Sequence, residues 1–255
     1  MKLSGRPYPF TPFRASSSPL PRGEEISFVF FDFAGTLVEG VPNWEHPQII
    51  ACREARLEVT PSQVKAAIWA VWGPLEGCAH VEASTSEMTY CDWIGAIERR
   101  ILEKLGVPAS QLDEATNRVM ELQVSPECYR IFPDVTPTLA RLREAGLHLG
   151  LISNFAWRLP ELADQLGLAA WFDLVVTSAQ VGYRKPRPEI FAYALNRLGA
   201  RATESLYVGD DPICDRDGAR AAGLTSLLLA RHQRSAPKYG RIRTLEQLAE
   251  LLGCA

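Results

Sequence analysis

Polar residues able to do chemistry follow several short apolar runs of this chain. Asp32 comes directly after the first run, and Ser153 follows a later one. Lys185 lies in a loop beyond the next run, and a further run is followed by an acidic group made of Asp210, Asp211, Asp215 and Asp217. One aspartate after a strand is often only a helix N-cap, and a lone lysine is usually solvated. Helix capping does not readily explain why four predicted strands in a row are each followed by residues of this kind.

These residue types fit the transfer of a phosphoryl group through an aspartyl phosphate. A carboxylate such as Asp32 can act as the nucleophile, but its charge repels a phosphate dianion. A Mg²⁺ held by Asp32, Asp210 and Asp215 would screen that repulsion and accept charge from the transferring group. The Ser153 hydroxyl and Lys185, with backbone amides at a helix start, would neutralise the phosphoryl oxygens.

The apolar runs that precede these residues are predicted to be strands of a parallel sheet. Residues 26–31 are almost continuously apolar, which is typical of a strand buried on both faces. Further strands are predicted at 147–152, 174–176, 206–208 and 227–229, alternating with helical patterns. Ligands of such doubly wound sheets bind beyond the carboxyl ends of the strands, so the polar residues are expected to meet there.

A helical segment separates the first strand from the others. Residues 43–128 show helical periodicity and no strand pattern. Thr60 to Gln63 is predicted to form a capping box, as are Ser84 to Glu87 and, before the last helix, Thr244 to Gln247. Gly106 is expected to end the helix that carries an apolar stripe from Ile94. The sequence therefore predicts an all-helical insert in an α/β domain.

Composition favours a soluble protein of the cytoplasm. The net charge of −3 gives no basic footprint for a nucleic-acid partner. The sequence has no run of about 18 apolar residues, so no membrane span is expected. The N-terminus does not resemble a secretory signal. The six cysteines show no metal-ligand spacing and are expected to be reduced thiols. Residues 1–24 are rich in proline and serine and are predicted to form a mobile tail.

Four segments together resemble the haloacid dehalogenase superfamily. They are Asp-Phe-Ala-Gly-Thr-Leu at 32–37, Leu-Ile-Ser-Asn at 151–154, Arg-Lys-Pro-Arg-Pro-Glu-Ile-Phe at 184–191, and Val-Gly-Asp-Asp at 208–211 with Asp215 and Gly218-Ala219. Their order and spacing extend over nearly the whole chain beyond residue 25. The set is specific for the superfamily and says little about the substrate.

The resemblance implies a Rossmann-like core formed by residues 25–42 and 129–255, with residues 43–128 as the α-helical cap of a subfamily I, C1-type member. It makes Asp32 the nucleophile, and it surrounds the phosphate with Ala34, Gly35, Thr36, Ser153, Asn154 and Lys185. It assigns a Mg²⁺ to Asp32, the backbone carbonyl of Ala34, Asp210 and Asp215. Whether Asp211 or Asp215 is the second acidic residue of the metal site stays open. The implied activity is that of a phosphatase acting on a small phosphorylated metabolite.

Ala34 departs from the pattern of the phosphatases in the superfamily. They usually carry a second aspartate there, which protonates the leaving oxygen and then activates water. Alanine can do neither, and general acid–base help contributes about 10²–10⁴-fold to a rate. Its absence should matter for an alkyl phosphate and matter less for a good leaving group, such as an acyl phosphate.

Three alternatives follow from Ala34. Dehalogenases of the superfamily need no such acid, but they use no metal and lack the acidic pair. Phosphonoacetaldehyde hydrolase, which also has Ala-Gly-Thr here, needs a cap lysine, and the cap offers only Lys65 and Lys104. A weakly catalytic protein that binds phosphorylated ligands or partners is the third, although a pure binder has no need of Asp32. The oligomeric state is not predicted.

Several cap and loop residues could line a substrate pocket, although packing explains each of them better. They are Trp44, His46, Trp69, Trp72 and His80 in the predicted cap, and Tyr183 and Arg184 before Lys185. Asp217 is interpreted as a charge at a helix start rather than a metal ligand.

Overall fold

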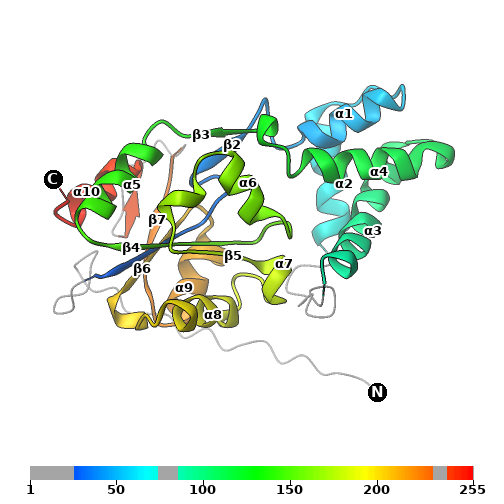
Figure 1. Cartoon of the computed structure of the whole chain (residues 1–255). Helices are drawn as coiled ribbons and strands as arrows, with labels where there is room; N and C mark the ends of the chain where they lie inside the picture. The colour runs from blue at the N-terminus through cyan, green and yellow to red at the C-terminus, as the bar shows by residue number, and fades with distance from the viewer. Residues whose placement is uncertain (1–25, 74–85, 232–239, 255) are drawn as a thin grey trace, which may run out of the picture.

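The computed structural model describes residues 26–73, 86–231 and 240–254 (Figure 1). The predicted tail at 1–24 lies outside these ranges, as do His80 and Ser84. The features below concern the described residues.

A six-stranded sheet forms the centre of the molecule. Its order is β5-β4-β1-β6-β7-β8, and every neighbouring pair is parallel. The strands are β1 (Phe28–Phe31), β4 (His148–Ser153), β5 (Leu174–Thr177), β6 (Ser205–Gly209), β7 (Thr225–Leu229) and β8 (Arg241–Ile242). The α/β, Rossmann-like architecture expected from the sequence is confirmed. The sequence did not predict β8, which has too few residues to produce a pattern.

Helices cover both faces of the sheet because side chains alternate along each buried strand. Val29 and Phe31 of β1 pack in one apolar cluster with α5, α6 and α10, whereas Phe30 packs in a second with α8 and α9. These helices are α5 (Val135–Glu144), α6 (Leu159–Gln165), α8 (Pro188–Leu198), α9 (Gly218–Ala221) and α10 (Leu245–Leu251), and a short α7 (Ser178–Val181) follows β5. Single-turn 3₁₀ helices are η3 (Ala109–Gln111), η4 (Pro126–Cys128), η5 (Ala169–Trp171) and η6 (Ala202–Glu204).

Four further helices stand to one side of the sheet (Figure 1). They are α1 (His46–Glu54), α2 (Pro61–Trp72), α3 (Glu87–Leu105) and α4 (Leu112–Leu122), and all of them fall inside the segment 43–128. Where the chain leaves and re-enters the core, β2 (Val38–Gly40) pairs with β3 (Tyr129–Ile131) in an antiparallel ladder. These four helices, α1 to α4, form the cap.

The predicted helix starts were partly right. The capping box from Thr60 to Gln63 is confirmed at the start of α2, and Gly106 ends α3 in a left-handed conformation. The second box is two residues later than predicted, with Ser86 as the N-cap and Thr89 as its partner. At α10, Thr244 is the N-cap, but Gln247 accepts from the Arg243 amide and no box forms.

The cap contacts the core through an apolar, largely aromatic surface. Tyr90 of α3 packs 6.4 Å from the Trp157 ring, which lies in the loop after β4. The Arg184 guanidinium lies 5.3 Å from the centre of the Trp72 ring at the end of α2. Ala179 of α7 belongs to the same apolar cluster as these cap residues.

None of the described helices combines the length and the apolar character that crossing a bilayer requires. The five cysteines within the described residues are free thiols.

Candidate active site

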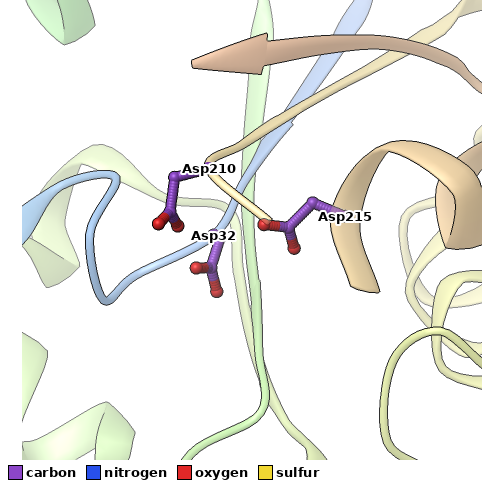
Figure 2. Close-up of side chains that lie close together, drawn as sticks. All are labelled: Asp32, Asp210 and Asp215. Carbon is purple, nitrogen blue, oxygen red and sulfur yellow. The ribbon is translucent and has the colours of Figure 1, made fainter. Parts of the chain in front are cut away.

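Three carboxylates meet at the carboxyl ends of neighbouring strands (Figure 2). Asp32 follows β1 and Asp210 follows β6, and β1 is paired with β6 over its whole length. Asp215 belongs to the π-helical turn η7 (Pro212–Asp217) that follows. One oxygen from each of the three side chains lies within 4.8 Å of the others. The rule that ligands bind at this edge of an open sheet therefore located the cluster.

The two carboxylate oxygens of Asp32 have different surroundings. Its Oδ1 accepts a hydrogen bond of 2.8 Å from the Ser153 hydroxyl and another of 2.7 Å from Lys185 Nζ. Among the described residues, no donor reaches its Oδ2. The side chain is buried, so these two bonds fix its orientation and leave one oxygen available for a reactant or a cation.

Lys185 is buried with only 3% of its surface exposed, and its ammonium is fully hydrogen-bonded. Its Nζ donates to Asp32 Oδ1 at 2.7 Å, to Asp215 Oδ1 at 2.5 Å and to the Tyr207 hydroxyl at 2.8 Å. Burial lowers the pKa of a lysine, but the charges of Asp215 and Asp32 more than offset this and raise the pKa of Lys185 above its usual value. The ammonium is therefore a fixed positive charge beneath the carboxylates.

Asn154 holds the lysine loop rather than an open position in the site. Its Nδ2 donates to the Lys185 carbonyl at 2.9 Å, and its Oδ1 accepts from the Lys185 amide at 2.7 Å. Both ends of the side-chain amide are thus occupied by the backbone of Lys185. A phosphate contact of Asn154, as predicted, would have to come from its backbone.

The π-helical turn separates the roles of Asp211 and Asp215. The Asp211 side chain caps the turn by accepting from the Ile213 and Cys214 amides at 2.8 and 2.7 Å. Asp215 is buried in the cluster, and its Oδ2 accepts from the Asp211 amide at 2.9 Å. The geometry places Asp215, not Asp211, beside Asp32 and Asp210. Gly209 allows this approach, because a side chain there would collide with the Asp215 carboxylate.

Thr36 and Gly35 shape the loop between β1 and β2 around Asp210. The Thr36 hydroxyl lies 3.4 Å from Asp210 Oδ1. Gly35 has a φ of +78°, a conformation that favours glycine, and a Cβ there would lie 2.5 Å from Asp210 Oδ2. Ala34 is half-buried and makes an isolated bridge to Val38, with no titratable group of its own.

Replacing Gly35 by alanine is expected to weaken Mg²⁺ binding about 10–100-fold, the range for changes to groups that orient metal ligands. The added methyl group would displace the Asp210 carboxylate, and the backbone would be strained. Titration calorimetry with Mg²⁺ measures the effect. Gly146→Ala is the matched control, because Gly146 has a φ of +81° but nothing within 4 Å of an added Cβ. Equal Mg²⁺ affinity in Gly35→Ala and the wild type would contradict the prediction.

The cluster carries more negative than positive charge. Burial is the largest cause that raises the pKa of Asp32 to about 6, with Asp215 adding to it and Lys185 opposing it. Asp210 is exposed at one edge, yet its carboxylate packs over Gly35, and desolvation with the charges of Asp32 and Asp215 raises its pKa to about 7. When all three carboxylates are ionised, they and the one ammonium leave an excess of two negative charges. A divalent cation would neutralise this excess.

The donor set fits Mg²⁺. All three side chains offer carboxylate oxygens, and no histidine or cysteine belongs to the described group. Hard cations such as Mg²⁺ and Ca²⁺ prefer such ligands. Asp210 offers a cation freer oxygens than Asp215, because both oxygens of Asp215 already accept hydrogen bonds from protein donors.

Two residues of the site were missed by the sequence interpretation. Tyr207 lies in the middle of β6 and reaches Lys185 with its hydroxyl. Arg231, just after β7, donates to the Thr36 carbonyl at 2.7 Å and to Asp134 Oδ2 at 2.8 Å. Arg231 follows a predicted strand end, so the same positional rule could have found it. For Tyr207 the signal was its place in a buried strand, because a buried tyrosine hydroxyl needs a hydrogen-bond partner.

The other residues considered from the sequence lie outside the carboxylate cluster. Lys65 and Lys104 are exposed on α2 and α3. Trp69 is 60% exposed, Trp44 packs beside Tyr129, and Asp217 pairs with Arg216. His46 is the first residue of α1, and Arg187 lies over the Tyr183 ring. Of the residues that the sequence singled out in the cap, the structure connects Trp72 to the loop of Lys185, through Arg184.

Two curated relatives each match a part of the chain. A protein from Mus musculus named "Haloacid dehalogenase-like hydrolase domain-containing protein 3" is 34% identical over 144 residues, which are 56% of this chain and 57% of that protein. The glyceraldehyde 3-phosphate phosphatase of Methanopyrus kandleri is 42% identical over 101 residues, which are 39% of this chain and 43% of that protein. The chain thus spans about half the length of these relatives.

One solved structure shares the fold of the chain, and a family model matches most of its sequence. The putative hydrolase YfnB of Bacillus subtilis superposes with a TM-score of 0.69 at 18% identity, covering 90% of this chain and 99% of that chain. This likeness shows the shared fold. The family model of haloacid dehalogenase-like hydrolases matches residues 26–223, which include Asp32, Lys185 and the acidic cluster. The chain therefore belongs to the haloacid dehalogenase-like hydrolase family.

Proposed function

We propose that the chain is a Mg²⁺-dependent phosphatase that acts on a small phosphorylated metabolite through an aspartyl phosphate on Asp32. The observation that carries this proposal is the asymmetry of the Asp32 carboxylate. Its Oδ1 is held by Ser153 and Lys185, and its Oδ2 is free of donors from the described residues. The phosphatase name of the Methanopyrus kandleri relative supports the substrate class.

The first step forms a bond between the free oxygen of Asp32 and phosphorus, and the bond from phosphorus to the leaving oxygen breaks. The leaving group departs with the electron pair. A Mg²⁺ held by Asp32, Asp210 and the Ala34 carbonyl, with Asp215 beside it, would neutralise charge on the phosphoryl oxygens. Lys185 and Ser153 keep the nucleophile oriented during the attack. Such fixed orientation is a large contribution to catalysis.

In the second step, water attacks phosphorus and the bond between phosphorus and the Asp32 oxygen breaks, which restores the carboxylate and releases inorganic phosphate. The proton of the water leaves with the phosphate or passes to solvent. Ala34 has no group that can give a proton in the first step or take one in the second. We therefore expect substrates whose leaving group departs without protonation, such as acyl phosphates and aryl phosphates.

The surroundings of the site favour phosphatase chemistry over the alternatives. Phosphonatase chemistry needs a lysine near the reacting carbon, and both cap lysines are exposed. Halide displacement does not need a cation, so it gives no reason for an excess of two negative charges around Asp32. A binding protein has no use for a buried, oriented carboxylate with one open oxygen.

Phosphate release by the purified chain tests the proposal. The assay compares acyl, aryl, sugar and nucleotide phosphates with Mg²⁺ present and after its removal by a chelator. We expect release with the acyl and aryl phosphates, loss of activity on chelation and recovery when Mg²⁺ is restored. A rate independent of Mg²⁺, or no release from any substrate while calorimetry shows that Mg²⁺ binds, would overturn the proposal.

A further inference from the structure

Tyr207 occupies a core position but directs its hydroxyl at the site. The residue lies in the middle of β6 with no exposed surface, and its ring packs edge-on against Phe191 at 5.2 Å. Its hydroxyl lies 2.8 Å from the Ile152 carbonyl, 2.8 Å from Lys185 Nζ and 3.2 Å from Asp215 Oδ1. An ammonium can only donate, so the tyrosine accepts from Lys185, and its single proton is directed to the nearer acceptor, the Ile152 carbonyl, with Asp215 Oδ1 as the more distant alternative.

The hydroxyl completes the hydrogen bonding of Lys185. An ammonium has three N–H donors, and three acceptors surround this one. Two are the carboxylate oxygens of Asp32 and Asp215, at 2.7 and 2.5 Å, and the third is Tyr207 at 2.8 Å. With all three donors used, each N–H of the ammonium has its own acceptor among the buried side chains.

We propose that Tyr207 is a positioning residue, which keeps the Lys185 ammonium on Asp32 Oδ1 and so leaves Oδ2 as the attacking oxygen. The inference rests on the proposed function, in which Asp32 is the nucleophile. The bond to Ile152 adds rigidity, because Ile152 directly precedes Ser153, the other residue that holds Asp32 Oδ1. Without the tyrosine hydroxyl, the two carboxylates alone hold the ammonium, and its third N–H turns to water or substrate.

Tyr207→Phe tests the proposal, because it removes the hydroxyl and keeps the ring against Phe191. With an aryl phosphate and saturating Mg²⁺, kcat is expected to fall about 10–100-fold, the effect of one hydrogen bond to a charged group, while KM changes less than about twofold. Ser205→Ala is the matched control. Ser205 is fully buried on the same strand, and its hydroxyl donates to the Arg201 carbonyl at 2.7 Å, away from the site. A purely structural role would lower the melting temperature of both variants and leave both kcat values alike.

A second measurement separates this inference from the proposed function. In protein labelled with ¹⁵N-lysine, a fixed and buried ammonium gives an NMR signal protected from solvent exchange, assigned by its loss in Lys185→Met. The signal is expected in the wild type and in Ser205→Ala, and lost or broadened in Tyr207→Phe. If no phosphate ester is hydrolysed but the signal behaves in this way, the proposed function fails and the positioning role stands. An unchanged kcat, or an unchanged signal, in Tyr207→Phe would overturn the inference.

Discussion

Asp32→Asn is expected to abolish phosphate release from every substrate that the wild-type protein hydrolyses. The amide keeps the shape of the side chain but cannot attack phosphorus, and removal of a catalytic nucleophile lowers kcat about 10⁴–10⁶-fold. The amide oxygen can still accept from Lys185, whose other acceptors, Asp215 and Tyr207, are unchanged, and one buried negative charge disappears from the cluster. The melting temperature is therefore not expected to fall.

Two measurements make the Asp32→Asn test specific. Rapid acid quench followed by intact-protein mass spectrometry should detect one bound phosphoryl group in the wild type and none in the variant. Asp217→Asn is the control, because this carboxylate pairs with Arg216 outside the cluster. A phosphoenzyme that persists in Asp32→Asn would assign the nucleophile to another residue.

The second substitution expected to have a large effect, at Ala34, should increase activity. Ala34→Asp is expected to raise kcat/KM for alkyl phosphates about 10²–10⁴-fold, the usual contribution of a general acid–base residue. Position 34 lies two residues beyond Asp32 on the loop that also contacts Asp210 through Thr36, so we expect a carboxyl group there to lie near the leaving group of a substrate bound at Asp32. Acyl phosphates should gain little, because their leaving group needs no proton.

Leaving-group dependence measures this gain. For the wild type, log kcat/KM should fall steeply as the pKa of the leaving group rises, and Ala34→Asp should flatten the slope. Ala34→Asn is the matched control, since it adds a group of the same shape that cannot transfer a proton. Equal slopes in the wild type and Ala34→Asp would mean that proton transfer at this position does not limit the reaction.

Local sequence patterns predicted the sheet well because its strands are buried on both faces. Such strands are continuous apolar runs, and β1, β4, β5, β6 and β7 were found within one or two residues of their ends. The meeting of Asp32, Ser153, Lys185 and the acidic cluster was predictable for a different reason. Parallel strands bring their carboxyl ends to one edge, so the order of the motifs along the chain was sufficient.

Long-range pairing and irregular turns could not be predicted in the same way. β2 and β3 have three residues each, and their ladder joins segments about 90 residues apart, with Arg130 paired to Glu39. The π-helical turn brings Asp215 rather than Asp211 beside Asp32 and Asp210, and no local period in the sequence reveals the register of this turn. In the sequence, Tyr207 was interpreted as one of the apolar residues of a buried strand, so the hydrogen bond between its hydroxyl and Lys185 was not predicted.

The contacts of Arg231 connect the end of the chain to the nucleophile loop. Asp134 Oδ2 accepts from Arg231 and also from the Leu245 amide at the first residue of α10, at 2.8 Å. Arg231 in turn holds the Thr36 carbonyl and stacks on Phe132, with 4.0 Å from its guanidinium carbon to the ring centre. Opening α10 exposes the partner of Arg231 to water and so loosens the hold on Thr36. In amide hydrogen exchange, the first turn of α10 and the loop after Asp32 should therefore behave as one cooperative unit of local unfolding.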